Sequence, residues 1–160
     1  MMQISKNDLK ETLSIAQATL GNGPDITSHF LFEKVGGEVF VSACNPPRIY
    51  SSIPLKGCKI DEIEEVEGEE VEGEEEVEPQ DAFQPFTIEG KRILKAINAV
   101  NGLLKISVDN GSVSIASDKG TLELSSLDPT VFPPWRGLLS DAKEMTNVPA
   151  NVLHDTLSIS

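Results

Sequence analysis

The first apolar positions of the chain follow two different periods. Residues 2–5 are a short, largely apolar stretch that predicts a β-strand. The next apolar residues recur at intervals of three and four, which is the spacing of one face of an amphipathic helix: Leu9, Leu13, Ala16 and Leu20. Ser5 or Asn7 can cap the start of this helix, and Gly21 with Gly23 supplies its stop.

Three β-strands are predicted to follow the helix. Residues 29–34 and 38–44 are rich in β-forming residues, and Gly36-Gly37 between them indicates a tight hairpin turn. Residues 48–55 have the composition of a third strand, with Pro54 near its end.

The same order of elements returns after residue 81. Residues 82–88 are predicted to be extended, and residues 89–100 form a second helical pattern with apolar residues on one face. Three more strands are expected at 103–109, 112–118 and 121–127, separated by the turn pairs Asn110-Gly111 and Lys119-Gly120. A unit of strand, helix and three strands therefore occurs twice. This predicts an α+β domain of duplicated β-α-β-β-β units at 1–127, with two helices packed on antiparallel sheets.

Residues 128–142 are predicted to be a linker. Residues 128–139 are proline-rich and irregular, which suits a segment that lies across a surface, with Trp135 packing it down. Residues 153–159 (LHDTLSI) then nearly repeat residues 9–15 (LKETLSI). We interpret 143–160 as the start of a second domain built like the first. The sequence is therefore expected to be the front part of a longer tandem-domain protein, or a truncated product.

The net charge of −13 is concentrated in one segment. Residues 61–81 hold 13 of the 26 acidic residues and no basic one, so the other 13 acidic residues balance the 13 lysines and arginines. This segment repeats EEVEGEE, and its mutual repulsion, glycines and isolated valines predict a solvated, disordered insertion. Such an insertion is either tolerated in a surface loop or serves as an acidic docking strip for a basic partner.

The sequence offers no catalytic, cofactor or metal site. Cys44 and Cys58 are too few and too far apart for a metal cluster or a disulfide framework. His29 and His154 have no serine or cysteine nearby in a nucleophile-like turn, and residues 21–25 (GNGPD) lack the Lys-Ser/Thr of a phosphate loop. The N-terminus lacks the apolar core of a secretory signal, and no apolar run is long enough to span a membrane. We therefore expect a non-enzymatic cytoplasmic protein that does not bind membranes.

One family matches this order of motifs. The stretch IEGKRILKAIN at 88–98, the strands that follow it, and the Ser126-Leu127 to Phe132-Pro133 stretch resemble the second half of the first domain of bacterial sliding clamps. These clamps are the β subunits of replicative DNA polymerase. The opening MMQISKNDLKETLSIAQ is similar to the N-terminal strand and helix of the same family.

The resemblance implies a DNA-clamp fold and a role as a processivity factor. In that family, six domains from head-to-tail chains close into a ring whose helices face a channel, and duplex DNA threads the channel without sequence readout. The implied partners are double-stranded DNA, the replicative polymerase, the clamp loader and further copies of the chain, in a bacterial cell or a phage-infected host. Five basic residues on the two predicted helices are the candidates to face DNA: Lys6, Lys10, Lys91, Arg92 and Lys95.

Two features depart from the family pattern. The loop after the first helix, residues 21–29, carries no lysine or arginine, and the acidic insertion at 61–81 is not part of the usual sequence. Because acidic residues in the channel would repel DNA, we expect the insertion to lie on the outer or lateral surface. An alternative function remains open from the same segment: a truncated, clamp-like interaction module, or DNA mimic, that uses residues 61–81 to bind a basic protein.

Overall fold

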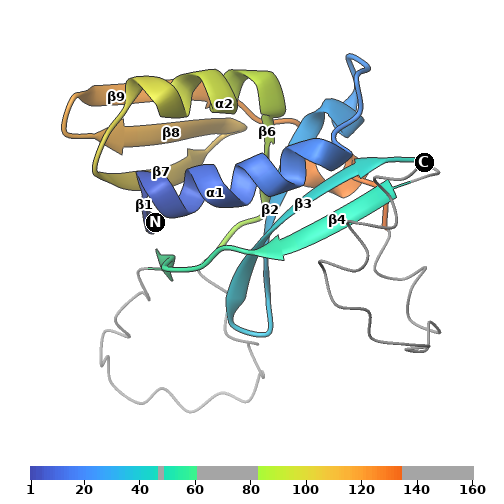
Figure 1. Ribbon diagram of the computed structural model, residues 1–160, viewed down its shortest axis with the longest axis horizontal. Helices are drawn as coiled ribbons and strands as arrows, with labels where there is room; N and C mark the ends of the chain where they lie inside the picture. Colours follow the sequence, from blue (N-terminus) through green and yellow to red (C-terminus); the bar gives the residue numbers. More distant parts are fainter. Residues whose placement is uncertain (47–48, 61–82, 135–160) are drawn as a thin grey trace, which may run out of the picture.

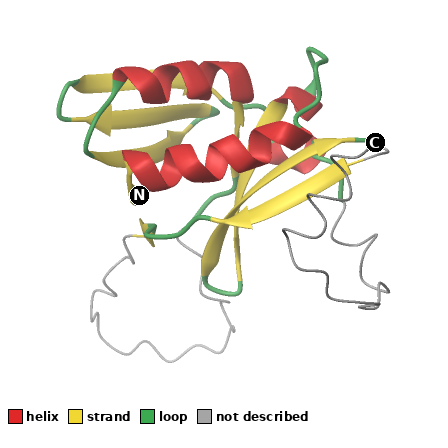
Figure 2. Ribbon diagram, viewed as in Figure 1, coloured by secondary structure: helices red, strands yellow, loops and turns green. Residues whose placement is uncertain are grey.

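The computed structural model describes residues 1–46, 49–60 and 83–134. Within these residues, helices α1 (Lys6–Ala16) and α2 (Gly90–Ala99) lie against two antiparallel β-sheets (Figures 1 and 2). The predicted acidic insertion at 61–81 and the predicted second domain at 143–160 lie outside the described residues. No helix in the described part of the chain is long and apolar enough to cross a membrane.

The predicted order of strand, helix and three strands is found twice. The first unit consists of α1 with strands β1 (Met2–Ser5), β2 (His29–Val35), β3 (Glu38–Asn45) and β4 (Ile49–Pro54). The second consists of α2 with strands β6 (Phe86–Glu89), β7 (Leu103–Asp109), β8 (Ser112–Ser117) and β9 (Gly120–Ser125). The sequence did not predict the two-residue strand β5 (Lys59–Ile60), which pairs with β1 at the edge of its sheet.

The two units exchange their first strands. One sheet has the order β5-β1-β7-β8-β9 and the other has the order β4-β3-β2-β6, so β1 pairs with the second unit and β6 with the first. The register is the same in both exchanges: Ser5, directly before α1, lies opposite Leu103, and Glu89, directly before α2, lies opposite His29. Leu103 and His29 each begin a three-stranded meander, so the duplication seen in sequence is also a duplication of geometry.

Helix α1 begins as predicted but ends earlier. The Ser5 hydroxyl oxygen accepts a hydrogen bond from the Asp8 backbone N–H at 3.1 Å, so Ser5 is the N-cap. The α-helix ends at Ala16 and continues only as a short 3₁₀ turn. The backbone N–H of Gly21 donates to the Thr27 carbonyl at 2.8 Å, and a Cβ at Gly21 would lie 2.3 Å from the Thr27 hydroxyl oxygen. The glycine is therefore needed for close approach to the next loop, and it does not cap the helix.

Two of the three predicted hairpin turns are confirmed. Gly36-Gly37 and Asn110-Gly111 have positive φ at both positions, as a type I′ turn requires. The third prediction was one residue too late. Gly120 already belongs to β9 and pairs with Ser117, so the turn residues are Asp118-Lys119.

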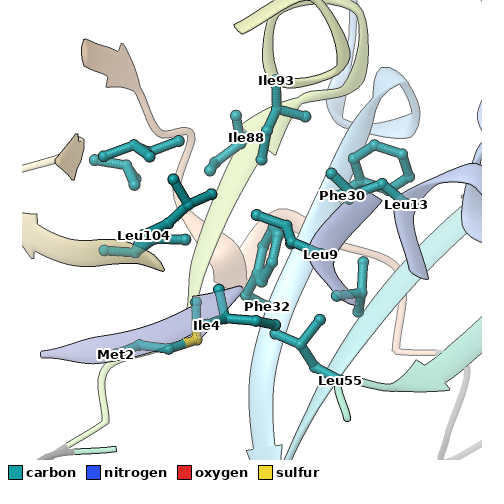
Figure 3. Packing of buried hydrophobic residues seen from close by; sticks show 14 of the residues in the cluster. Met2, Ile4, Leu9, Leu13, Phe30, Phe32, Leu55, Ile88, Ile93 and Leu104 are labelled. Carbon is teal, nitrogen blue, oxygen red and sulfur yellow. The ribbon is translucent and has the colours of Figure 1, made fainter. Parts of the chain in front are cut away.

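The core lies between the helices and both sheets (Figure 3). The apolar stripes predicted for the two helices are largely buried in it, although Leu20, beyond the end of α1, and Leu94 of α2 are only partly buried. Phe32 of β2 stacks on Phe86 of β6, with ring centroids 4.6 Å apart and planes 7° apart. Residues far apart in sequence therefore meet in one cluster, including Met2, Ile4, Leu9, Leu13, Phe30, Ile88, Ile93 and Leu104.

A second, smaller cluster lies on the other face of the β4-β3-β2-β6 sheet. Phe132 is 5% exposed and packs with Leu31 and Cys44, which point away from the main core. The described start of the predicted linker therefore packs along this sheet. Phe132 holds it there, whereas the predicted anchor Trp135 lies outside the described residues.

Candidate nucleic-acid interface

Helices α1 and α2 are antiparallel neighbours (Figure 1). At one end, the backbone N–H of Lys6, the first residue of α1, donates to the carbonyl of Gly102, just after α2, at 2.9 Å. At the other end, a Cβ on Gly90, the first residue of α2, would lie 2.4 Å from Leu20, just after α1. The start of each helix therefore lies beside the end of the other, and the two helices share one outward surface.

The charges of α1 are divided between its two sides. Lys6 and Lys10, one turn apart, lie on the side toward the end of α2, and the Lys6 ammonium donates to Asn101 Oδ1 at 3.0 Å. The Asp8 carboxylate lies on the opposite side, where it accepts from the Ser5 hydroxyl at 2.6 Å and approaches Gly57. Glu11 is exposed, next to Lys10 in sequence. The basic side of α1 thus faces its partner helix.

The cations of α2 differ in their availability. Lys91 and Lys95 are both exposed, and Lys91 lines a hollow together with Gln17 from the end of α1. Arg92 is also exposed, but its Nε lies 2.6 Å from Glu89 Oε2, so much of its charge is matched by a carboxylate one turn earlier. Glu89 and Arg92 are three residues apart, so the sequence alone already indicated that the two side chains could pair on a helix.

Four of the five predicted residues therefore lie on the two neighbouring helices, and within the described residues none of these four forms an ion pair with an acidic side chain. We call these four the basic helical surface: Lys6, Lys10, Lys91 and Lys95. The side chain of Asn101, which follows α2, contacts Lys6. Only the fold reveals this contact, because the two residues are 95 positions apart in sequence.

Two hollows flank the basic helical surface. The first, which we call the Lys6–Asn101 hollow, has a volume of about 480 Å³ and is lined by Ser5, Lys6, Asn7, Lys10, Asn101 and Gly102. The second, of about 560 Å³, lies between the end of α1 and the start of α2 and includes Glu89, Lys91 and the buried His29. The His29 Nδ1 lies 3.2 Å from the Asp25 carbonyl oxygen.

The other face of the β5-β1-β7-β8-β9 sheet carries lysines of its own. Leu104 and Ile106 of β7 point into the core, so Lys105 between them points away from the helices and is exposed. Lys59 of β5 and Lys105 lie on either side of Gln3 in the sheet register. Lys59 and Lys105 can therefore serve as a control for the basic helical surface, since they bear the same charge on the opposite side of the sheet.

The remaining titratable groups of the described residues are separate and largely structural. Among residues 1–46, 49–60 and 83–134, no three histidine, cysteine, aspartate or glutamate side chains are grouped to hold a metal ion. Burial raises the pKa of the Cys44 and Cys58 thiols to about 11, so both are protonated near neutral pH. Hydrogen bonds from Thr27 hold the pKa of Asp25 below its usual value.

The fold resembles solved bacterial DNA polymerase clamps. The β clamp of Helicobacter pylori, solved with a DNA ligase peptide, is 23% identical with a TM-score of 0.59, over 83% of this chain and 32% of that chain. The β subunit of DNA polymerase III from Thermotoga maritima is 16% identical with a TM-score of 0.57, over 93% and 34%. The β chain from Streptococcus pneumoniae is 11% identical with a TM-score of 0.58, over 93% and 34%.

These comparisons concern structure only. No protein-family model and no curated protein matches the sequence. The chain spans about a third of the length of the clamps that it resembles. The resemblance expected from the sequence is thus confirmed at the level of the fold: two helices on two antiparallel sheets, arranged as in the bacterial β clamps.

Proposed function

We propose that this protein is a clamp-like processivity factor that holds duplex DNA against its helices and tethers a replicative polymerase. The observation that supports this proposal best is the antiparallel helix pair, which gathers Lys6, Lys10, Lys91 and Lys95 on one surface of a clamp fold. The proposed mode is binding to the phosphate backbone, with no readout of base sequence.

The physical properties of the basic helical surface suit this mode. Lysine is a flexible point charge on a long stem, so it reaches phosphates at many positions without demanding one geometry. Contacts to phosphates fix the position of a protein on DNA but carry no sequence information. A clamp that slides needs this tolerance, because every base pair must be bound equally well. Arg92 contributes less in this proposal, because Glu89 already pairs with it.

Encircling DNA requires more than one such domain. We propose the division stated from the sequence: a clamp domain at 1–127, a linker at 128–142 and the start of a second domain at 143–160. The ring would be completed by further domains or further copies of the chain. The proposed partners are duplex DNA, a replicative polymerase and its clamp loader, in the cytoplasm of a bacterial cell or a phage-infected host.

Face-specific charge reversal tests the proposal. Binding of the 160-residue chain to short fluorescent duplexes of two unrelated sequences is measured by anisotropy over a series of salt concentrations. Wild type should bind both duplexes equally, with a Kd on the order of 10⁻⁴–10⁻⁶ M that weakens with salt. Lys10→Glu with Lys95→Glu should weaken binding by roughly tenfold or more, because each reversal replaces a phosphate contact with a repulsion.

The matched control is Lys59→Glu with Lys105→Glu, which makes the same charge change on the opposite side of the sheet. This pair should weaken binding by no more than about twofold at moderate salt, because it acts only through distant, screened charges. Equal losses in the two double variants would overturn the proposal. An absence of DNA binding together with salt-sensitive binding to basic proteins would instead favour the acidic interaction module suggested by residues 61–81.

A further inference from the structure

We propose that the Lys6–Asn101 hollow binds one phosphate group of the DNA backbone. The inference rests on the proposed function and adds a defined contact point to it. The hollow is formed by two segments that lie far apart in sequence, the start of α1 and the turn after α2. The lining residues and their placement both indicate an anionic ligand.

The side chains that line the hollow are mainly hydrogen-bond donors. Lys6 and Lys10 supply ammonium groups, and Asn7 and Asn101 supply side-chain amides. None of the described residues that line the hollow is acidic. The two acidic residues of α1 are outside this lining: the Asp8 carboxylate is bound to the Ser5 hydroxyl and lies toward Gly57, and Glu11 is exposed next to Lys10 in sequence. A phosphate oxygen entering the hollow would therefore meet donors.

The two lysines occupy unfavourable positions for the isolated helix. Lys6 is the first residue of α1, where the helix dipole disfavours a cation. Lys10 lies one turn later, and like charges four residues apart on a helix repel each other. A bound anion removes both penalties, because it neutralises the lysines and interacts favourably with the start of the helix. Departures from local rules of this kind are expected where a site binds a ligand.

Asn101 restrains the Lys6 side chain before a ligand binds. Its Oδ1 accepts from the Lys6 ammonium at 3.0 Å, and both residues line the hollow, so the bond restrains the amine there. An ammonium group has two further N–H donors, and the Asn101 amide nitrogen has two of its own. Lys6 and Asn101 are thus ordered before the ligand arrives, so less conformational entropy is lost on binding than at an unrestrained surface lysine.

Chemical-shift titration of the wild-type chain distinguishes the sources of the phosphate. Backbone amide resonances are followed while either a short DNA duplex or inorganic phosphate is added. We expect both ligands to shift the amides of Ser5, Lys6, Asn7, Asn101 and Gly102, and DNA alone to shift further amides along α1 and α2. Shifts along the helices with none in the hollow would overturn this inference and leave the proposed function intact. Shifts in the hollow with phosphate, but none anywhere with DNA, would retain an anion site and refute the role on DNA.

A pair of isosteric variants gives a second test. Asn101→Asp places a carboxylate in the hollow, whereas Asn98→Asp adds the same charge on α2, outside the hollow residues. We expect Asn101→Asp to weaken DNA binding roughly tenfold and to abolish the phosphate-induced shifts. Asn98→Asp should weaken DNA binding roughly two- to threefold and keep the phosphate shifts. Equal effects of the two variants on both ligands would contradict a defined site. Amide spectra without ligand confirm that both variants are folded.

Discussion

Thr87 and Leu127 exchange two hydrogen bonds through a single hydroxyl group. The Thr87 Oγ1 donates to the Leu127 carbonyl at 2.9 Å and accepts from the Leu127 backbone N–H at 2.9 Å. Thr87 is fully buried in β6, whereas Leu127 follows β9 in the other sheet. The backbone N–H of Thr87 also donates to the Ser126 hydroxyl at 3.0 Å. One buried threonine therefore joins the two sheets and directs the chain as it leaves the second unit.

Replacing this hydroxyl should cost stability although the shape is kept. Thr87→Val leaves the Leu127 N–H without its acceptor, whereas the Leu127 carbonyl still accepts from the Ser126 hydroxyl at 3.1 Å. A buried polar group that loses its partner costs about 1–3 kcal/mol. We expect a lower free energy of unfolding by about that amount in urea titration. Thr121→Val, an exposed threonine on β9, is the matched control and should change stability by less than about 0.5 kcal/mol. A negligible effect of Thr87→Val would mean that the hydroxyl contributes no net stability.

Phe132 is expected to control access to the Cys44 thiol. Both side chains belong to the small cluster on the outer face of the β4-β3-β2-β6 sheet, and burial raises the Cys44 pKa to about 11. At pH 8 only about one thiol in a thousand is then ionised, so reaction with Ellman's reagent should be slow in a Cys58→Ser background. Phe132→Ala should open the cluster and speed this reaction at least roughly tenfold, since it lowers the thiol pKa and admits the reagent.

The neighbouring Val131 provides the control for this experiment, because it is 57% exposed. Val131→Ala should leave the rate of thiol modification unchanged. Equal rates for Phe132→Ala and wild type would show that the described start of the linker does not cover Cys44 in solution. Circular dichroism separates local opening of the cluster from global unfolding of the variant.

Ser5 should stabilise α1 as its N-cap. Its hydroxyl oxygen accepts from the Asp8 backbone N–H, and its hydroxyl group donates to the Asp8 carboxylate at 2.6 Å. Ser5→Ala is expected to lower the free energy of unfolding by about 1 kcal/mol. Ser14→Ala, where an exposed hydroxyl donates to the Lys10 carbonyl within the helix, should be neutral or slightly stabilising. The reverse order in thermal unfolding would show that Ser5 is not the effective cap.

Local elements of this fold were predictable from sequence, whereas the pairings between distant segments were not. The apolar stripe on each helix and the Gly36-Gly37 and Asn110-Gly111 turns depend on neighbouring residues, so their signals lie within short windows. The exchange of β1 and β6 between sheets depends on pairing between segments far apart in sequence, such as Ser5 with Leu103 and His29 with Glu89, for which a single sequence carries no pattern. Strand β5 was missed for a related reason: two residues have no periodicity, and only pairing with β1 makes them a strand.

In the candidate interface, too, the local features were predictable from sequence and the long-range contacts were not. Helical spacing placed Lys6 and Lys10 on one side of α1, because that relationship is local. The contact between Lys6 and Asn101 needed the antiparallel arrangement of the helices, and the hollow that they line follows from it.

Lys10 is expected to lower the folding stability slightly and to strengthen DNA binding. It lies one helical turn from Lys6, and removal of one charge relieves a like-charge pair worth about 0.2–0.5 kcal/mol. Lys10→Gln should therefore raise the free energy of unfolding slightly while it weakens DNA binding and reduces the slope of log K against log salt by about 0.9. Lys105→Gln on the opposite side of the sheet should change neither the slope nor the stability appreciably. A less stable Lys10→Gln variant would indicate that Lys10 has a structural role instead.

The acidic segment should weaken DNA binding at low salt through long-range repulsion. Residues 61–81 carry 13 acidic side chains and account for the whole net charge of −13. Replacing their glutamates with glutamines removes long-range repulsion without shortening the chain, so DNA affinity should rise at low salt. The gain should vanish near physiological salt, where screening acts over about 8 Å. Anisotropy titrations of wild type and the neutralised variant at several salt concentrations measure both effects. If the segment instead serves to bind a basic protein, neutralisation should abolish that interaction at every salt concentration and leave DNA affinity unchanged.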